Sequence, residues 1–205
     1  MKTIIENTKA EIVEKRSKFI SNLYYVETVD QAENKLKEIK KEYNDARHNC
    51  FAYRIYEKKA IIEKAGDDGE PSGTAGAPML NLLSKLDLAN CLVVVTRYFG
   101  GILLGTGGLV RAYTEVAKQT IDKANLVIMQ IGEEMLVTIT YNKLGEFQYY
   151  CQKNNINIID IKYGENIICK IQTIAEKKEK LLQETVKKQY NIQNIEVTKE
   201  VYIKK

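Results

Sequence analysis

Apolar and polar positions repeat with clear periods in the second half of the chain. Alternation from about residue 133 predicts a strand, because successive strand side chains point to opposite faces. A spacing of three to four residues predicts helices at 144–151 and 176–190. Further strands are expected at 156–163, 167–173 and 195–203. The resulting order, β-α-β-β-α-β, is that of a ferredoxin-like domain with two helices on one face of an antiparallel sheet.

The first half has a less regular pattern. Residues 11–16 and 18–26 are expected to form a hairpin, and 49–56 and 60–64 a second strand pair. Thr28 and Gln31 have the spacing of a capping box, and an amphipathic helix is expected after them. The apolar, β-branched run at 91–96 predicts a buried strand. Helices are expected to end near residue 86 and to follow residue 106. We therefore predict an α+β protein of two domains, residues 1–130 and 131–205.

Glycine and proline are concentrated in one part of the chain. Nine of the twelve glycines and both prolines lie between Gly66 and Gly108. Because glycine adopts backbone conformations that other residues avoid, such a concentration indicates special local geometry and a candidate site.

The segment 96–113 runs from the buried strand through a glycine loop into a helix. Thr106 is expected to cap this helix, leaving the N–H groups of Gly107, Gly108 and Leu109 free to bind an anion at the positive end of the helix dipole. Arg97 and Arg111 could each add a bidentate phosphate contact, and Tyr98 could stack on a base. The alternative is a purely architectural strand–loop–helix connection. The loop matches neither nucleotide-binding glycine motif, the Walker or the Rossmann type.

The segment 66–78 carries three acids, Asp67, Asp68 and Glu70. They could hold Mg²⁺ through carboxylates and water. The same residues are also good turn formers, and this structural interpretation is the one we favour, with Ser72 or Thr74 as a cap for the following helix. No metal and no cofactor is therefore expected.

Arg47 and His48 precede a predicted strand and form a possible contact site. His48 could be a general base or a phosphate ligand, although a single histidine here is more often structural. His48 and Cys50 do not suggest a catalytic dyad, and no catalytic residue is assigned.

Composition and charge indicate which partners and which cellular location to expect. The 205 residues include 44% apolar and 28% charged residues and carry a net charge of +4, which permits but does not require contact with RNA. No apolar run approaches the ~20 residues that span a bilayer, and no signal peptide is evident. We expect a cytoplasmic protein without a membrane partner, whose four separated cysteines are reduced.

The two glycine segments, together with Arg47, His48 and residues 50–53, resemble the signature of the IMPACT/YigZ family. The resemblance implies an N-terminal two-layer α/β sandwich with the left-handed βαβ fold of a ribosomal protein's C-terminal domain. It also implies a C-terminal domain like the last domain of elongation factor G. For bacterial members it implies a role in translation or nucleic-acid binding.

Three functions follow as hypotheses. The first is a translation-associated regulatory protein that binds RNA, the ribosome or another phosphate-bearing partner. The second is a phosphate- or nucleotide-handling enzyme with the fold of small-molecule kinases, against which no lysine or acid stands at a catalytic spacing. The third is an adaptor that binds a protein partner. We favour a binding protein over an enzyme.

Overall fold

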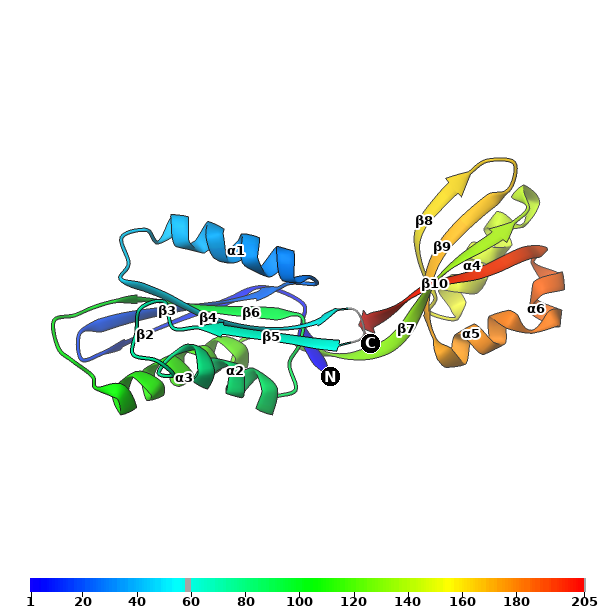
Figure 1. The fold of residues 1–205 in the computed structure, drawn as a ribbon. Coiled ribbons are helices and arrows are strands. Elements are labelled where there is room, and N and C mark those ends of the chain that lie inside the picture. Colours follow the sequence, from blue (N-terminus) through cyan, green and yellow to red (C-terminus); the bar gives the residue numbers. More distant parts are fainter. Residues whose placement is uncertain (58–59, 205) are drawn as a thin grey trace. The chain divides into compact units, whose positions relative to one another are not determined.

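The computed structural model of the chain describes residues 1–57 and 60–204, which divide into two compact units, Met1–Ile128 and Met129–Lys205. We call them unit 1 and unit 2. Each unit is built on an antiparallel sheet, and six α-helices are found among the described residues (Figure 1). The predicted two-domain α+β class is confirmed.

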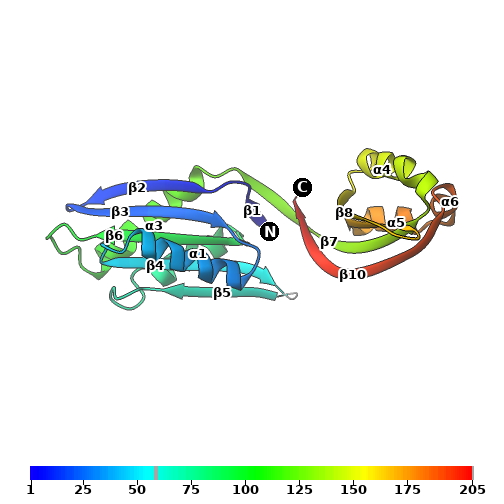
Figure 2. The same ribbon diagram turned by 90° about the horizontal axis from the view of Figure 1, so that it is seen from above.

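Unit 1 is built on a five-stranded sheet with the order β2-β3-β6-β4-β5, and every neighbouring pair is antiparallel (Figure 2). The strands are β2 (Thr8–Glu14), β3 (Ser17–Tyr25), β4 (His48–Glu57), β5 (Ala60–Gly66) and β6 (Cys91–Tyr98). The apolar run predicted as a buried strand is β6, at the centre of the sheet. Its position explains its composition, because both of its faces are covered.

Helices cover both faces of this sheet. They are α1 (Val29–Glu42), α2 (Gly76–Lys85) and α3 (Thr106–Asp122). α2 and α3 pack on one face and α1 on the other, each over its own apolar cluster (Figure 1). The expected sandwich of two layers is therefore extended by a third layer, α1. Side chains alternate across a strand, so β4 and β6 can supply both clusters.

Thr28 caps α1 as its sequence spacing predicts. The Thr28 hydroxyl accepts a hydrogen bond from the Gln31 N–H at 3.2 Å. The Gln31 side chain reaches back to the N–H of Glu27 at 2.8 Å, one residue earlier than in the standard box.

One strand and the early start of another were not expected from the periodicity. The short β1 (Lys2–Ile4) pairs antiparallel with the first residues of β7 (Leu126–Ile139), and β7 begins before the expected start of its strand. Strand pairing of this kind joins residues more than 120 positions apart, which no local pattern reveals.

Unit 2 has the predicted ferredoxin-like fold. Its elements are β7, α4 (Leu144–Lys153), β8 (Asn157–Tyr163), β9 (Ile167–Ile174), α5 (Ala175–Leu182), α6 (Glu184–Gln189) and β10 (Ile192–Lys204), with a short 3₁₀ turn, Tyr141–Lys143, before α4. The strand order is β10-β7-β9-β8, and all pairs are antiparallel. Met135, Val137 and Ile139, which alternate along β7, are fully buried. They form one apolar core with the buried residues of α4 and α5.

The single helix expected at 176–190 is divided into α5 and α6. Gln183 has extended backbone angles (φ −63°, ψ 136°) and separates the two helices. The apolar spacing continues across this break, so periodicity alone does not show it.

Candidate functional site

One end of the unit 1 sheet gathers all the segments that the sequence singled out. His48 pairs with Arg97, and Phe51 pairs with Gly66, so β4 starts where β5 and β6 end. The acidic segment after β5 and the glycine loop after β6 therefore leave the sheet at the same end. The β2–β3 turn lies there too, because Lys18 pairs with Tyr98.

Asp67 has a structural role in the acidic loop. Its carboxylate accepts hydrogen bonds from the N–H groups of Gly73 (2.8 Å), Ala75 (3.0 Å) and Gly76 (2.8 Å), where α2 begins. Partial burial raises the pKa of Asp67, but these bonds outweigh it, and the net result is a lowered pKa. Asp67 thus caps α2, and neither Ser72 nor Thr74 does. The Thr74 hydroxyl donates to the Pro71 carbonyl instead, at 2.6 Å.

Asp68 ties the loop to β4 and α1. Its carboxylate accepts from the Asn49 N–H at 2.7 Å and pairs with the Lys40 ammonium at 2.6 Å. Its backbone oxygen lies 2.8 Å from His48 Nδ1, and because a carbonyl oxygen can only accept, Nδ1 is the donor in this hydrogen bond. His48 is thereby oriented by the loop.

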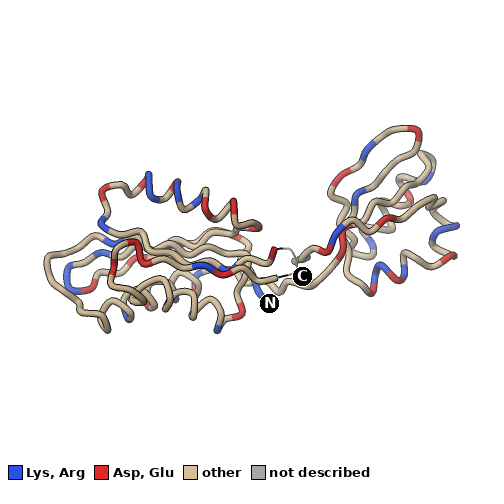
Figure 3. The backbone as a smooth tube through the Cα atoms, viewed as in Figure 1, with Lys and Arg blue, Asp and Glu red and all other residues tan. Residues whose placement is uncertain are grey.

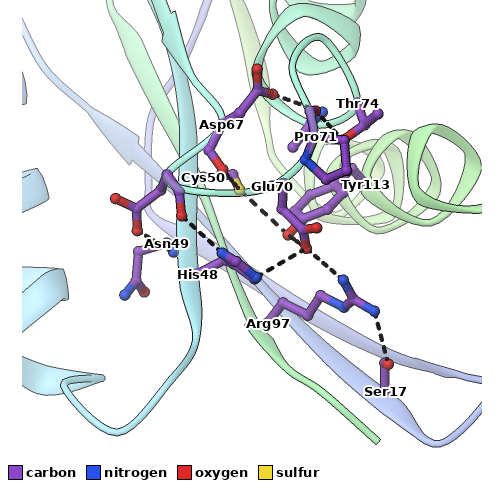
Figure 4. A network of polar contacts seen from close by, with 12 residues as sticks. Ser17, His48, Asn49, Cys50, Asp67, Glu70, Pro71, Thr74, Arg97 and Tyr113 are labelled. Carbon is purple, nitrogen blue, oxygen red and sulfur yellow. Dashed lines mark hydrogen bonds and ion pairs between the residues drawn. The ribbon is translucent and has the colours of Figure 1, made fainter. Parts of the chain in front are cut away.

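Glu70 forms the centre of a buried polar network, drawn in Figure 4. Its Oε1 lies 2.6 Å from Arg97 Nη1 and accepts a hydrogen bond from the Tyr113 hydroxyl at 2.9 Å. His48 Nε2 lies 3.9 Å from the same oxygen. Arg97 Nη2 donates to the Ser17 hydroxyl at 3.2 Å. This network joins the acidic loop to β3, β6 and α3.

Burial favours the protonated, uncharged forms of Tyr113 and of Cys50, which lies next to the network. It is the main cause that raises the pKa of the Tyr113 hydroxyl and that raises the pKa of the Cys50 thiol to about 12. Cys50 lies 2.9 Å from the Asp67 carbonyl and 3.4 Å from the Tyr113 hydroxyl. Because the thiolate is the reactive form, Cys50 is held inert at neutral pH.

Arg97 is not accessible for binding an anion at the glycine loop. It is only 5% exposed, and its guanidinium lies over the rings of Phe19 (5.3 Å) and Phe99 (5.6 Å) while bound to Glu70. The expected phosphate contact by Arg97 is corrected on this ground: its charge is already balanced by a buried carboxylate.

The start of α3 also differs from the expectation, in its capping residue and in the N–H group of Leu109. Gly105, with φ of +73°, occupies the capping position, and Thr106 is the first residue of the helix. No side chain of the capping residue bonds to the helix start. The first backbone bond of the helix runs from the Leu109 N–H to the Gly105 carbonyl at 2.9 Å, so the prediction of a free Leu109 N–H is wrong. The N–H groups of Thr106, Gly107 and Gly108 therefore precede that bond and remain available.

Arg111 lies on the same side of α3 as Gly107, about one helical turn further along. Its Nη1 is 3.9 Å from the point where a Cβ would stand on Gly107, and its side chain is exposed. The exposed start of α3 thus combines three backbone donors, the positive end of the helix dipole and one free guanidinium.

Arg47 and Phe99 form an exposed pair at the same end of the sheet. The Arg47 guanidinium lies 5.7 Å from the Phe99 ring centroid, and Phe99 is 38% exposed. Tyr98 is less available, because its hydroxyl donates to Asp45 at 2.8 Å.

The sequence motifs do not single out Ser17 or Tyr113 as site residues. Tyr113 lies on the buried side of α3, where it is inaccessible to solvent. A buried tyrosine hydroxyl needs a hydrogen-bond partner, and that requirement was the available signal.

Charges of both signs are interspersed along both units (Figure 3). Among the described residues, no group of three or more His, Cys, Asp or Glu side chains is arranged to hold a metal ion. No helix in the described part of the chain is long and apolar enough to cross a membrane.

Comparisons with known proteins agree on one family. The family model of the Impact N-terminal domain matches residues 15–121, and a domain of unknown function (DUF1949) matches residues 137–184. The chain is 41% identical over 177 residues to IMPACT family member YvyE of Bacillus subtilis, covering 86% of this chain and 80% of the relative. It is 35% identical over 153 residues to YigZ of Escherichia coli, covering 74% of this chain and 69% of the relative.

A solved structure is similar over nearly the whole length. The crystal structure of a hypothetical protein superimposes with a TM-score of 0.70 at 27% identity, covering 96% of this chain and 95% of the other. Taken together, the matching family model, which spans more than half of the chain, and the relatives show that the chain belongs to the IMPACT family.

Proposed function

We propose that this protein is a cytoplasmic, translation-associated regulatory protein that binds RNA or the ribosome through one end of the unit 1 sheet. Its membership of the IMPACT family supports the link to translation. The observation that carries the binding role is the exposed guanidinium of Arg111, which lies beside Gly107 near the start of α3, where the N–H groups of Thr106, Gly107 and Gly108 precede the first helical bond.

The chemistry of this position suits a phosphate group. Backbone N–H groups at a helix start point at an anion, and a guanidinium can donate two parallel hydrogen bonds to phosphate oxygens. Arg47 and Phe99 add a second cation and an exposed ring on which a nucleobase can stack. A single-stranded nucleic acid can therefore place a phosphate at the start of α3 and stack a base on Phe99 at the same time.

The test is binding to purified ribosomes and to single-stranded RNA over a range of salt concentrations. The variants are Arg111→Glu and Arg47→Glu, because Arg97→Glu would break the buried network and confuse folding with binding. Lys118→Glu is the matched control: it makes the same charge change on the exposed side of α3, about 10 Å further along the helix axis.

Phosphate contacts release counterions, so affinity should fall steeply with salt, by about 0.7 in the logarithmic slope for each single-strand contact. Arg111→Glu should weaken binding and reduce that slope, while Lys118→Glu should change both much less. Equal effects of the two variants would show that only net charge matters. Absence of binding at low salt would refute the proposal.

A further inference from the structure

Along the outer edge of β2, backbone N–H and C=O groups are not paired with any strand of the described residues. β2 is the first strand of its sheet and pairs only with β3 among the described residues. The connection to β3 is a two-residue turn, Lys15 and Arg16, with φ of 45° and 65°, as a type I′ turn requires. Such a turn is closed by a hydrogen-bonded pair, here Glu14 and Ser17.

The alternation of an antiparallel ladder then fixes the direction of every backbone group in β2. Glu14 and Ile12 bond to β3, so Val13 and Glu11 direct their N–H and C=O groups away from it. Lys9 has the same phase, and its carbonyl indeed accepts a hydrogen bond from Lys123 at 3.3 Å, outside the sheet. The free edge is therefore short and consists of Glu11 and Val13.

A groove of about 630 Å³ lies beside this edge, between β2 and α3. The apolar side chains of its lining are those of Ile12, Leu104, Val110 and Ala112. Ile12 and Leu104 also pack against the core of unit 1, so this part of the lining is fixed. The neighbouring Val13 and Leu103 are 68% and 81% exposed.

The charges of the groove are arranged in two pairs. Lys15 and Arg111 line it at the end near the glycine loop, and Glu14 and Glu115 come next, Glu115 one helical turn after Arg111. None of the four has an ion-pair partner within residues 1–57 and 60–204. The groove thus offers a positive end followed by a negative stretch.

We propose that this groove binds an extended peptide segment that pairs with the free edge of β2. Strand addition supplies the N–H and C=O partners of Glu11 and Val13, and every second peptide side chain points into the groove. The charges select a segment with an acidic side chain facing Lys15 and Arg111. A basic side chain about two positions away faces Glu14 and Glu115, and an apolar residue covers Ile12 and Val110.

The shortness of the free edge favours a peptide over a second copy of this chain. Pairing of two β2 strands would need more of the edge than Glu11 and Val13. Lys123 already occupies the Lys9 carbonyl, and charged edge residues oppose such pairing. A short segment needs only the part of the edge that is free.

The test uses a phage-displayed library of random seven-residue peptides, selected on the full-length chain and screened against Val13→Pro. Proline at position 13 removes only an outward N–H and is tolerated on an edge strand. Val13→Thr is the control, because it keeps the N–H and the β-branched shape. Circular dichroism and urea unfolding confirm that both variants fold.

We expect selected peptides to carry an acidic and a basic residue two positions apart. They should bind Val13→Pro at least about tenfold more weakly than the parent or Val13→Thr, because the loss of the N–H leaves a peptide carbonyl unpaired. Amide NMR shifts on peptide addition should centre on Glu11, Val13 and Arg111.

Three outcomes would overturn the proposal. The first is that no peptide prefers the parent over a folded Val13→Pro. The second is that NMR shifts lie away from β2 and α3. The third is that sedimentation shows a dimer of the parent that Val13→Pro abolishes, which would assign the edge to a second copy. RNA binding is measured separately: Val13→Pro should leave it intact, and Arg47→Glu should leave peptide binding intact, so failure of one proposal is distinct from failure of the other.

Discussion

The buried pair of Glu70 and Arg97 allows a quantitative test of what holds the candidate site together. Replacing Glu70 by alanine removes the carboxylate that lies 2.6 Å from Arg97 and accepts the Tyr113 hydroxyl. Both side chains of the ion pair are almost inaccessible, at 6% exposed for Arg97 and 3% for Glu70. The remaining guanidinium is then an uncompensated charge out of water, which costs about 3–5 kcal/mol of unfolding free energy.

Urea unfolding followed by circular dichroism measures this loss. With a slope of about 2 kcal/mol per molar urea, a loss of about 4 kcal/mol lowers the midpoint of the unit 1 transition by about 2 M. Glu11→Ala is the control, because the pair of Glu11 and Lys18 has a similar distance of 3.0 Å but is exposed. Its removal should cost less than about 1 kcal/mol.

A double variant separates the charge from the contacts. Glu70→Leu with Arg97→Met replaces the pair by apolar side chains and leaves no buried charge, so it should be more stable than Glu70→Ala. The reasoning is refuted if Glu70→Ala loses no more stability than Glu11→Ala. It is also refuted if the double variant is the least stable of the three.

Three further results are expected. Asp67→Ala should lower stability by about 0.5–2 kcal/mol at neutral pH through loss of a helix cap. Because the folded pKa of Asp67 is lowered, its contribution is complete above about pH 4 and is lost as the pH falls through the folded pKa, so urea midpoints of variant and parent should converge in acid. Gly100→Ala should destabilise unit 1, since its Cβ would lie 2.0 Å from the Arg16 backbone, whereas Gly145→Ala, with open space around it in α4, should raise the thermal midpoint of unit 2 slightly. Cys50, buried and with a pKa of about 12, should react with a thiol reagent at neutral pH only after unfolding, as mass spectrometry would show.

Local features of this protein could be derived from the sequence because they depend on residues close together in the chain. The ferredoxin-like order of unit 2, the capping spacing of Thr28 and Gln31 and the buried strand predicted at 91–96 all follow from periods of two or 3.6 residues and from cap chemistry. The interpretation of the acidic loop as turn and cap chemistry rests on the same kind of rule. For Asp67, however, the capped helix starts nine residues later.

The tertiary structure decided what the charged residues do. Arg97 and Glu70 are 27 positions apart, and only the pairing of β4 with β5 and β6 brings their loops to one end of the sheet. Arg97 and Arg111 are equivalent cations in the sequence, yet the first is buried against a carboxylate and the second is exposed beside Gly107 in the first turns of α3. Burial and charge pairing arise from contacts between distant segments. The sequence pattern could therefore name the candidate residues but could not divide them between stability and binding.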